Sequence, residues 1–416
     1  MLDLRLIRSD TDAVAAALAR RGDGSESRLA EVLALDARRR ELLPQVEGTK
    51  AEQNAASQEI GKAKAAGEDA SAAIAAMQEV AARGKQLAAE LEEVEQKLDP
   101  LLASLPNVPD ESAADGDTVV REVGDKRDLG FPARDHLELA GPDRIDMERG
   151  ARLSGSRFAY LRGDLARLDL ALVSWTLDLL TGHGFEPVFP PVLVREEALF
   201  GTGFLPDTEQ QIYRLADDDL YLTGTSEVAL ASLHAGEILD EVPRHYAGFS
   251  PCFRREAGAA GRDTRGIFRV HQFDKVEMFS FVRPEDSVAE HERLLSIEEE
   301  ILQTLGIPYR VVNISVDDLG ASAAKKFDCE AWIPSQEQYR ELTSTSNTTD
   351  YQARRLNIRF RNEDGKPEIA HTLNGTAVAV GRTIVALLEN GQQEDGSVDL
   401  PKCLARFGAP ARLTAA

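Results

Sequence analysis

The sequence predicts an α+β protein with an N-terminal antiparallel coiled-coil hairpin, followed by an antiparallel-sheet domain flanked by helices. Two helical segments, 29–60 and 73–101, carry apolar stripes and are separated by a short polar stretch. Beyond residue 140, short β-type runs alternate with glycine-rich turns and a few helices, rather than in regular βαβ units. We therefore predict an N-terminal domain at 1–105, a linker at 106–140 and a second domain at 141–416.

Composition narrows the class of protein. The 416 residues are enough for two or three domains, and 43% of them are hydrophobic. No apolar run reaches the roughly 20 residues that span a bilayer, so we expect no membrane association. The N-terminus lacks a signal-peptide pattern, and three distant cysteines form no CxxC pair. These features predict a cytoplasmic protein with no structural zinc. The net charge of −23 leaves nucleic-acid binding open, because such binding needs only a local basic face.

The hairpin prediction depends on a heptad pattern in the second segment. Its seam residues follow steps of three and four: Ala73, Met77, Val80, Gly84, Leu87, Leu91, Val94, Leu98 and Leu101. Pro100 and Pro106 mark the expected end. The first segment has a poorer seam, because Thr49 and Gln53 fall on or beside it, and Pro44 predicts a kink. Gly67 lies in a plausible reversal between the segments. The alternative is a coiled coil that dimerises between chains.

The second domain begins with one clear helix. Asp164 is expected to cap an amphipathic helix that runs to about Thr181. No GxxxxGKS and no strand-linked GxGxxG occurs, so a nucleotide site here would be neither a P-loop nor a Rossmann crevice.

The stretch from Phe253 to Glu277 predicts a strand, a glycine-rich hairpin loop and a second strand. In this reading Arg254 and Glu256 share a strand face, while Arg269 and Glu277 are about 26 Å apart along an extended strand. Guanidinium groups on a sheet are suited to bidentate bonds with phosphate oxygens. The alternative is that these charges form surface ion pairs.

A second chemical signal lies at 374–383. Gly375, Ala377, Ala379 and Gly381 recur at every second position, which predicts a strand face almost without side chains. Such a face admits either a flat ligand ring or a closely packed helix. A helix is predicted to follow from Ile384, which places Arg382 near an N-terminus that favours phosphate.

These two blocks resemble the second and third signature motifs of class II aminoacyl-tRNA synthetases, and in particular the seryl-tRNA synthetase family. The segment 184–193 resembles the first motif, a dimer-interface element, and 222–227 resembles the family's Thr-Ala-Glu element with Ser226 in place of alanine. Residues 248–281 match the family at nearly every position. The hairpin resembles the arm that grips the long variable arm of serine tRNA.

The resemblance implies roles for individual residues. The expected serine-binding residues are Thr225, Ser226, Glu227, Glu277, Asn374 and Thr376. The expected ATP-binding residues are Arg254, Arg255, Glu256, Arg269, Val270, Phe273, Glu341, Leu342, Thr343, Ser344 and Arg382. Arg254 and Arg382 are the expected catalytic residues, and Glu341 and Ser344 the expected Mg²⁺ ligands. Because side chains alternate along an extended segment, Ser226 is nevertheless expected to point away from Thr225 and Glu227. At the second departure from the family, Leu342-Thr343 replaces a commoner Ile-Ser pair.

The activity implied by the resemblance is ATP-dependent formation of seryl-adenylate from L-serine, followed by transfer of the seryl group to tRNA(Ser) and also to tRNA(Sec). A homodimer is implied as well. The basic hairpin residues expected to contact tRNA phosphates are Arg38, Arg39, Arg40, Lys62, Lys64, Arg83 and Lys85. Two alternatives remain: a paralogue that loads an amino acid onto a carrier protein, and a coiled-coil regulator with a decayed synthetase core.

Overall fold

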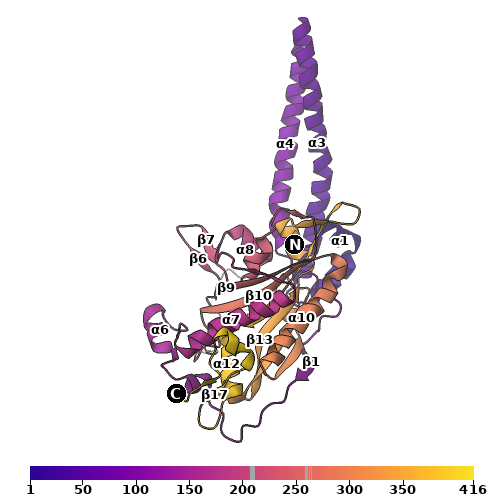
Figure 1. The fold of residues 1–416 in the computed structure, drawn as a ribbon. Helices are drawn as coiled ribbons and strands as arrows, with labels where there is room; N and C mark the ends of the chain where they lie inside the picture. The colour runs from indigo at the N-terminus through magenta and orange to yellow at the C-terminus, as the bar shows by residue number, and fades with distance from the viewer. Residues whose placement is uncertain (207–210, 258–260, 262, 264) are drawn as a thin grey trace. The chain divides into compact units, whose positions relative to one another are not determined.

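The computed structural model describes residues 1–206, 211–257, 261, 263 and 265–416. It divides into two compact units, Leu2–Pro106 and Asn107–Ala416, the second of which also includes Met1 (Figure 1). The predicted domain boundaries, including the linker at 106–140, stay a prediction. Among the described residues, no helix is long and apolar enough to cross a membrane.

The N-terminal unit is a helical hairpin preceded by short helices. The helices are α1 (Leu4–Ser9), α2 (Thr11–Ala19), α3 (Leu29–Ala66) and α4 (Ser71–Ala103). Gly67 ends α3 with a φ of 73°, a left-handed conformation in which glycine lacks the Cβ clash. Helix α4 continues through Pro100 and ends at Ala103, between the two prolines that were expected to mark its end. The prediction of an antiparallel hairpin within one chain is confirmed.

The contacts between α3 and α4 explain why the heptad pattern of the first helix is irregular. A Cβ on Gly84 of α4 would lie 3.0 Å from Gln53 Nε2 and 3.1 Å from Thr49 Oγ1 of α3. The two polar residues that disturbed the heptad pattern therefore face the one glycine in the partner seam. Ion pairs also join the helices: Arg39 Nε is 2.9 Å from Glu95 and Arg83 Nη2 is 2.6 Å from Glu52.

The second unit is built on an eight-stranded sheet in the order β1-β11-β12-β13-β16-β10-β9-β4. The pairs are antiparallel except β4 with β9. The strands are β1 (Thr118–Val123), β4 (Glu186–Val188), β9 (Arg244–Phe253), β10 (Gln272–Val282), β11 (Tyr309–Asn313), β12 (Lys325–Ile333), β13 (Gln338–Asn347) and β16 (His371–Ala379). The predicted α+β class with an antiparallel sheet is confirmed.

Helices cover one face of this sheet. They are α7 (Asp164–Gly182), α10 (Ser287–Thr304) and α12 (Val380–Gly391), which lie side by side over the strands in Figure 1. Their apolar residues form one core with the sheet residues Val276, Met278 and Ala377. Helix α7 matches the predicted helix, but its N-cap is Gly163, and Asp164 makes no capping hydrogen bond.

Shorter elements complete the second unit. The helices are α5 (His136–Ala140), α6 (Met147–Ser154), α8 (Glu196–Thr202), α9 (Glu227–Ser232) and α11 (Tyr351–Leu356). The small sheets are β2 (Ile145–Asp146) with β3 (Tyr160–Leu161); β5 (Leu193–Val194), β7 (Leu220–Leu222) and β6 (Tyr213–Leu215); β15 (Pro367–Ile369), β14 (Arg359–Arg361) and β8 (Ile238–Leu239); and β17 (Val398–Asp399) with β18 (Arg412–Leu413). Helices α9 and α11 share a second apolar core with Phe279 and Phe281, on the sheet face opposite Met278.

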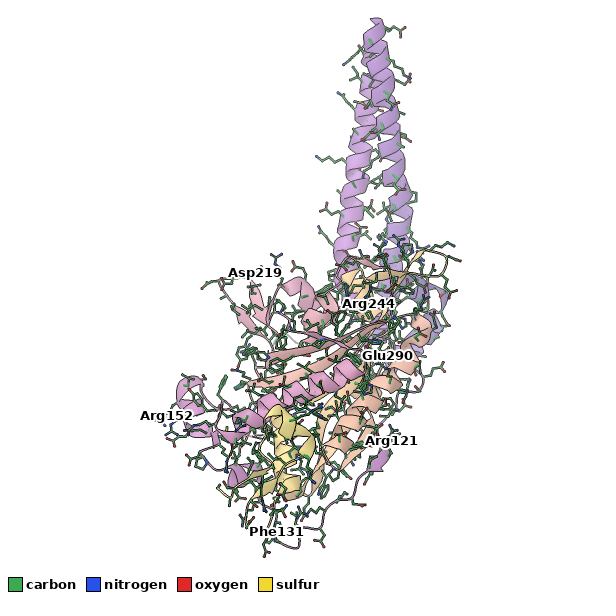
Figure 2. The ribbon with its side chains drawn as sticks, viewed as in Figure 1. Arg121, Phe131, Arg152, Asp219, Arg244 and Glu290 are labelled. Carbon is green, nitrogen blue, oxygen red and sulfur yellow. The ribbon has the colours of Figure 1, made fainter. Side chains whose placement is uncertain are left out.

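Polar contacts tie α10 to the sheet. Arg121 of the edge strand β1 donates from Nε to Glu299 Oε1 of α10 at 2.9 Å (Figure 2). Glu290, also on α10, accepts a 2.7 Å hydrogen bond from Ser280 of β10. These bonds fix the helix across the sheet, directly behind the strands that carry the site described next.

Candidate active site

A cavity of about 360 Å³ opens on the sheet face opposite α10. The alternation of β13 and β16 shows which face it is. The Thr343 hydroxyl donates to Glu298 of α10, and a Cβ on Gly375 would lie against the same carboxylate, whereas the neighbouring Ser344 and Asn374 line the cavity on the other face. Every residue predicted from the sequence to bind a substrate lines this cavity, except Ser226 and Arg255.

One end of the cavity centres on Glu277 of β10. Asn374 Nδ2 donates to Glu277 Oε1 at 3.1 Å, and Thr376 Oγ1 donates to Oε2 at 3.4 Å. The side chain of Glu277 is 1% exposed. The structure thus brings three of the predicted serine-binding residues together across the β10–β16 pair.

Lys275 is a cation at this end that the sequence reasoning missed. Its Nζ lies 2.5 Å from Glu277 Oε2 and donates to Thr225 Oγ1 at 2.7 Å, and the residue is 6% exposed. The sequence does contain a signal for Lys275, because it is two residues from Glu277 and residues two apart in a strand share a face. Lys275 compensates the negative charge of a carboxylate that would otherwise be buried alone.

A second buried carboxylate, Glu227, is the first residue of α9. Gln352 of α11 donates from Nε2 to Glu227 Oε1 at 2.8 Å, and the Glu227 amide donates to Thr225 Oγ1 at 3.2 Å. Burial, followed by the charge of Glu277, raises the pKa of Glu227 to about 7. Gln352 also escaped prediction, and no local pattern links it to a residue so distant along the chain.

Arginines gather at the other end of the cavity. Arg382 is the third residue of α12, and its Nη1 lies 3.2 Å from Glu341 Oε1 and 3.0 Å from the Glu341 carbonyl oxygen. Arg254 donates from Nε to the Gly224 carbonyl at 3.2 Å, and its guanidinium carbon lies 5.4 Å from the centre of the Phe273 ring. Burial alone would raise the pKa of Glu341, but the charges of Arg382, Lys326 and Arg254 lower it below its usual value.

The predicted strand geometry around Arg254 was wrong. Strand β9 ends at Phe253 and β10 begins at Gln272, so Arg254, Glu256 and Arg269 lie on connecting segments. The reason is the backbone of Glu256, whose φ of 51° is incompatible with an extended strand. Arg269 Nη1 is 2.6 Å from Glu256 Oε2, which is the ion pair that the alternative interpretation expected. The predicted loop falls partly outside the described residues.

The predicted smooth strand face also needs correction. Gly375 and Ala377 turn toward the helices, and a Cβ on Gly375 would lie 2.9 Å from Glu298 Oε1. Helix packing therefore explains this half of the pattern. The pairing of β10 with β16 shifts register between Val276 and Glu277, which leaves Ala377 as a bulge. Ala379 and Gly381 consequently do line the cavity.

Four predicted residues do not point their side chains into the cavity. Ser226 donates to the Gly248 carbonyl at 3.3 Å, and Arg255 is exposed outside the lining. Leu342 belongs to the hydrophobic core, and Thr343 donates to Glu298 Oε2 at 2.9 Å. Leu342 and Thr343 can therefore contact a ligand only through their backbone atoms.

Comparison with known proteins identifies the architecture. A family model described as the seryl-tRNA synthetase N-terminal domain matches residues 1–109, and one described as the tRNA synthetase class II core domain (G, H, P, S and T) matches residues 211–391. The chain is 50% identical over 414 residues to the serine–tRNA ligase of Thermobifida fusca, covering 98% of this chain and 97% of that one. The chain belongs to the seryl-tRNA synthetase family.

Solved structures agree with this membership of the seryl-tRNA synthetase family. A seryl-tRNA synthetase from Pyrococcus horikoshii, complexed with ATP, matches with a TM-score of 0.92, 43% identity and full coverage of both chains. A cytoplasmic serine–tRNA ligase from Naegleria fowleri, in complex with AMP, matches with a TM-score of 0.87, 31% identity, and coverage of 100% of this chain and 99% of that one.

Proposed function

We propose that this cavity activates L-serine with ATP to form seryl-adenylate, and that the protein transfers the seryl group to tRNA(Ser). The observation that carries the proposal is the polarity of the cavity. One end holds the carboxylates Glu227 and Glu277 with hydroxyl and amide groups, and the other holds Arg254 and Arg382. A small zwitterionic amino acid and a triphosphate require these two kinds of end in one cavity.

The serine end is suited to an amino acid with a hydroxyl group. The ammonium group would bind between Glu227 and Glu277, and Thr225, Asn374 and Thr376 supply hydrogen-bonding partners. Asn374 and Thr376 already hold Glu277 at 3.1 and 3.4 Å, so the carboxylate is oriented before substrate arrives. An analogue without the hydroxyl would leave buried polar groups unpaired, which disfavours alanine.

The arginine end supports in-line displacement at the α-phosphorus. The carboxylate of serine attacks that phosphorus, a bond to the serine oxygen forms, and the bond to pyrophosphate breaks. Arg254 would bind the α-phosphate and Arg382 the γ-phosphate, where their charges stabilise the developing negative charge. Val270 and Phe273 line the same cavity and would contact the adenine, with Glu256 and Arg269 beside them.

The donor set fits Mg²⁺ bound together with ATP. Glu341 offers a carboxylate whose pKa is lowered, and Ser344 offers a hydroxyl on the same cavity face. One carboxylate with substrate phosphates and water is the usual environment of this ion. When bound, Mg²⁺ would neutralise phosphate charge. Arg382 already pairs with Glu341, so both groups would be held at the phosphate end.

The hairpin α3–α4 is proposed to bind the tRNA within an N-terminal domain at 1–105, joined by a linker to a catalytic domain at 141–416. Several basic residues named from the sequence are engaged inside the hairpin. Arg39, Arg83 and Lys62 lie 2.9, 2.6 and 2.9 Å from Glu95, Glu52 and Glu59. Lys64 and Lys85 are exposed, and no ion pair of theirs occurs among the described residues. These two are the better phosphate contacts. By family resemblance tRNA(Sec) would be a second acceptor.

The second unit carries apolar side chains that support a homodimer. Phe189, in the segment that resembles the first motif, is 72% exposed, Leu170 is 65% exposed and Leu153 is 71% exposed. Covering them would remove apolar surface from water. Sedimentation equilibrium would show a single monomeric species if this proposal is wrong. Cys252, Cys329 and Cys403 are all free, which fits a reducing cytoplasm.

The proposed reaction is tested by serine-dependent exchange of pyrophosphate into ATP, followed by transfer of labelled serine to tRNA(Ser). We expect exchange with serine, much weaker exchange with alanine, and transfer to the tRNA. Absence of exchange with serine would refute the proposal. Exchange without transfer would instead favour the enzyme that loads a carrier protein.

A further inference from the structure

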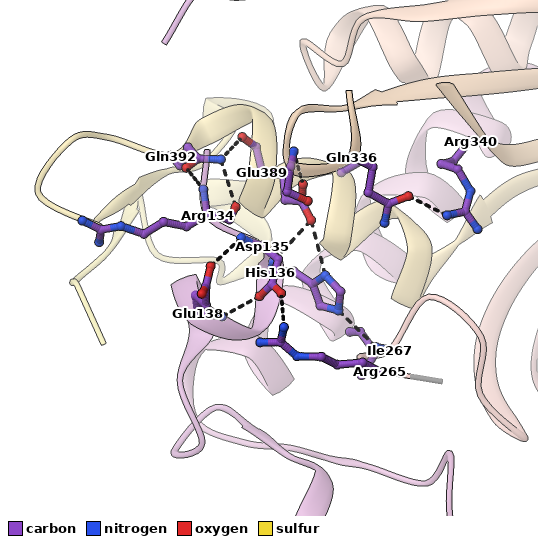
Figure 3. A network of polar contacts seen from close by, with 12 residues as sticks. Arg134, Asp135, His136, Glu138, Arg265, Ile267, Gln336, Arg340, Glu389 and Gln392 are labelled. Atoms are coloured by element: carbon purple, nitrogen blue, oxygen red, sulfur yellow. Dashed lines mark hydrogen bonds and ion pairs between the residues drawn. The ribbon is translucent and has the colours of Figure 1, made fainter. Parts of the chain in front are cut away.

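A buried histidine–glutamate pair lies behind the wall of the cavity, outside its lining. His136 is the first residue of α5, and Glu389 lies near the end of α12 (Figure 3). His136 is 5% exposed and Glu389 is fully buried. None of the roles proposed for the reaction uses either residue, and a buried ionisable pair requires its own explanation.

The hydrogen bonds of His136 define its tautomer. The backbone N–H of Ile267 points at Nε2, with a nitrogen–nitrogen distance of 3.2 Å. An amide N–H can only donate, so Nε2 must carry a lone pair and the ring proton must be on Nδ1. Nδ1 lies 3.4 Å from Glu389 Oε1 and donates to it. The imidazole is therefore neutral and links a carboxylate to a backbone amide.

Glu389 is itself held by the backbone. Its Oε1 accepts from the His136 amide at 3.3 Å, and its Oε2 accepts from the Ser335 amide at 3.0 Å. The carboxylate therefore has partners on both oxygens and forms a fixed anchor for the ring. A cation is not needed to satisfy it.

The His136 ring contacts the segment that contains Ile267 and Phe268, which line the proposed ATP end of the cavity. Gly266 has a φ of 87°, and a Cβ there would lie 2.1 Å from His136 Nε2, so this backbone runs against the edge of the ring. The next residue but one, Phe268, stacks under two guanidinium groups. Its ring centre lies 4.9 Å from Arg382 Cζ and 4.2 Å from Arg340 Cζ.

We propose that His136 is a positioning residue for ATP, which holds Ile267 and Phe268 in place and thereby orients Arg382 toward the phosphates. The inference rests on the proposed function of the cavity as an ATP site. His136 acts through the backbone of Ile267 and the ring of Phe268, without touching the substrate. The serine end, which is built on β10, β16 and the start of α9, does not depend on it.

The test compares His136→Leu with His136→Gln in pyrophosphate exchange, with ATP and serine varied in turn. Leucine removes the acceptor for the Ile267 amide, whereas the carbonyl oxygen of glutamine restores one. We expect His136→Leu to raise the KM for ATP about tenfold or more while the KM for serine changes less than about twofold. His136→Gln should recover most of the loss. His183→Leu, which removes a histidine paired with Glu300 outside the cavity lining, should leave both KM values unchanged.

The outcomes separate this inference from a purely structural role. Equal rises in both KM values, or a glutamine variant as poor as the leucine variant, would overturn it. If His136→Leu does not fold, Glu389→Gln keeps the side-chain shape and removes one acceptor oxygen. It should then raise the KM for ATP alone, by about threefold, and no rise would overturn the inference. A wild-type protein without serine-dependent exchange would overturn the proposed function as well, whereas active wild type with an unaffected His136→Leu refutes only this inference.

Discussion

At the scale of single residues, the proposed serine end of the cavity contains two carboxylates in different environments. Glu277 lies beside Lys275 at 2.5 Å and accepts bonds from Asn374 and Thr376. Glu227 has the neutral partner Gln352, and burial with the charge of Glu277 raises its pKa to about 7. The two carboxylates therefore have different partners, a cation for Glu277 and a neutral amide for Glu227.

The raised pKa of Glu227 predicts a pH dependence of serine binding. Below pH 7 the free protein holds Glu227 protonated, and its neutral carboxyl attracts an ammonium group weakly. Serine binding should then release a proton, and the affinity should fall about tenfold from pH 8 to pH 6. Calorimetry with serine alone avoids the titration of ATP. Glu227→Gln should give weaker binding with a flat profile, and an equally steep profile in that variant would assign the dependence to another group.

Lys275 predicts a stability change that serine partly reverses. Lys275→Met leaves Glu277 buried without its cation, and breaking a buried pair in this way costs about 3–5 kcal/mol. Because serine, bound as proposed, would bring an ammonium group to the same place, the ligand should raise the melting temperature more in the variant than in the wild type. The matched control is Lys366→Met, an exposed lysine 3.5 Å from Asp364, for which we expect a change below about 0.5 kcal/mol. An equal loss in both variants would contradict the role of Lys275.

At the scale of elements, two bulges explain why part of the site was predictable and part was not. The family resemblance named Asn374 and Thr376, and both residues line the cavity from β16. The alternation in the sequence put Ala379 on the same face as Gly375 and Ala377, whereas the bulge at Ala377 turns Ala379 to the cavity. In β13 the register shifts between the partners of Thr343 and Glu341, so Leu342 is extra, and Glu341 and Ser344 line one cavity despite a separation of three residues. A local pattern does not specify a bulge, since the partner strand takes part in forming it.

The tight packing of α10 on β16 predicts the effect of a single methyl group. In Gly375→Ala, the added carbon would lie 2.9 Å from Glu298 Oε1, 3.1 Å from Met278 Cε and 3.2 Å from Thr345 Oγ1. We expect a loss of about 1–3 kcal/mol in the free energy of unfolding, measured with urea. Gly182→Ala, at the end of α7 with nothing within 4 Å of the added carbon, should be neutral or stabilising by up to about 1 kcal/mol. Comparable losses in both would mean that the space around Gly375 does not limit the strand.

In the hairpin, too, local sequence patterns predicted the helices but not every feature of them. Heptad spacing predicted the second helix, a matching apolar stripe predicted its partner, and Gly67 in a short polar stretch predicted the reversal between them. Pro44 was expected to kink the first helix and Pro100 to lie at the end of the second, and α3 and α4 both contain their proline. Packing along the seam outweighs the local cost of a proline, which is about 3 kcal/mol. Gln352 and the His136–Glu389 pair could not be predicted, because they meet the site through tertiary contacts alone.

At the scale of the whole molecule, two compact units divide the work proposed for the protein. The residues that line the cavity all belong to Asn107–Ala416, and the hairpin belongs to Leu2–Pro106. The net charge of −23 is compatible with tRNA binding only if the positive charges that meet phosphate are local and uncompensated. Acidic neighbours pair with Arg39 and Arg83, and the exposed Lys64 and Lys85 are therefore the residues proposed to contact phosphate.

This division predicts the effect of replacing Lys64 and Lys85 by alanine. Pyrophosphate exchange should be unchanged, because neither residue belongs to the unit that contains the cavity. Affinity for tRNA(Ser) should fall, and the slope of log affinity against log salt should decrease by about one for each true phosphate contact.

Lys97→Ala is the matched control on α4, since Lys97 lies 2.7 Å from Glu93 and its charge is already compensated. Filter binding from low to moderate salt gives the slopes. An unchanged slope in the Lys64 and Lys85 variants would place both residues on a solvated face. A slope lowered equally by Lys97→Ala would show that pairing within the hairpin does not decide which lysines bind phosphate.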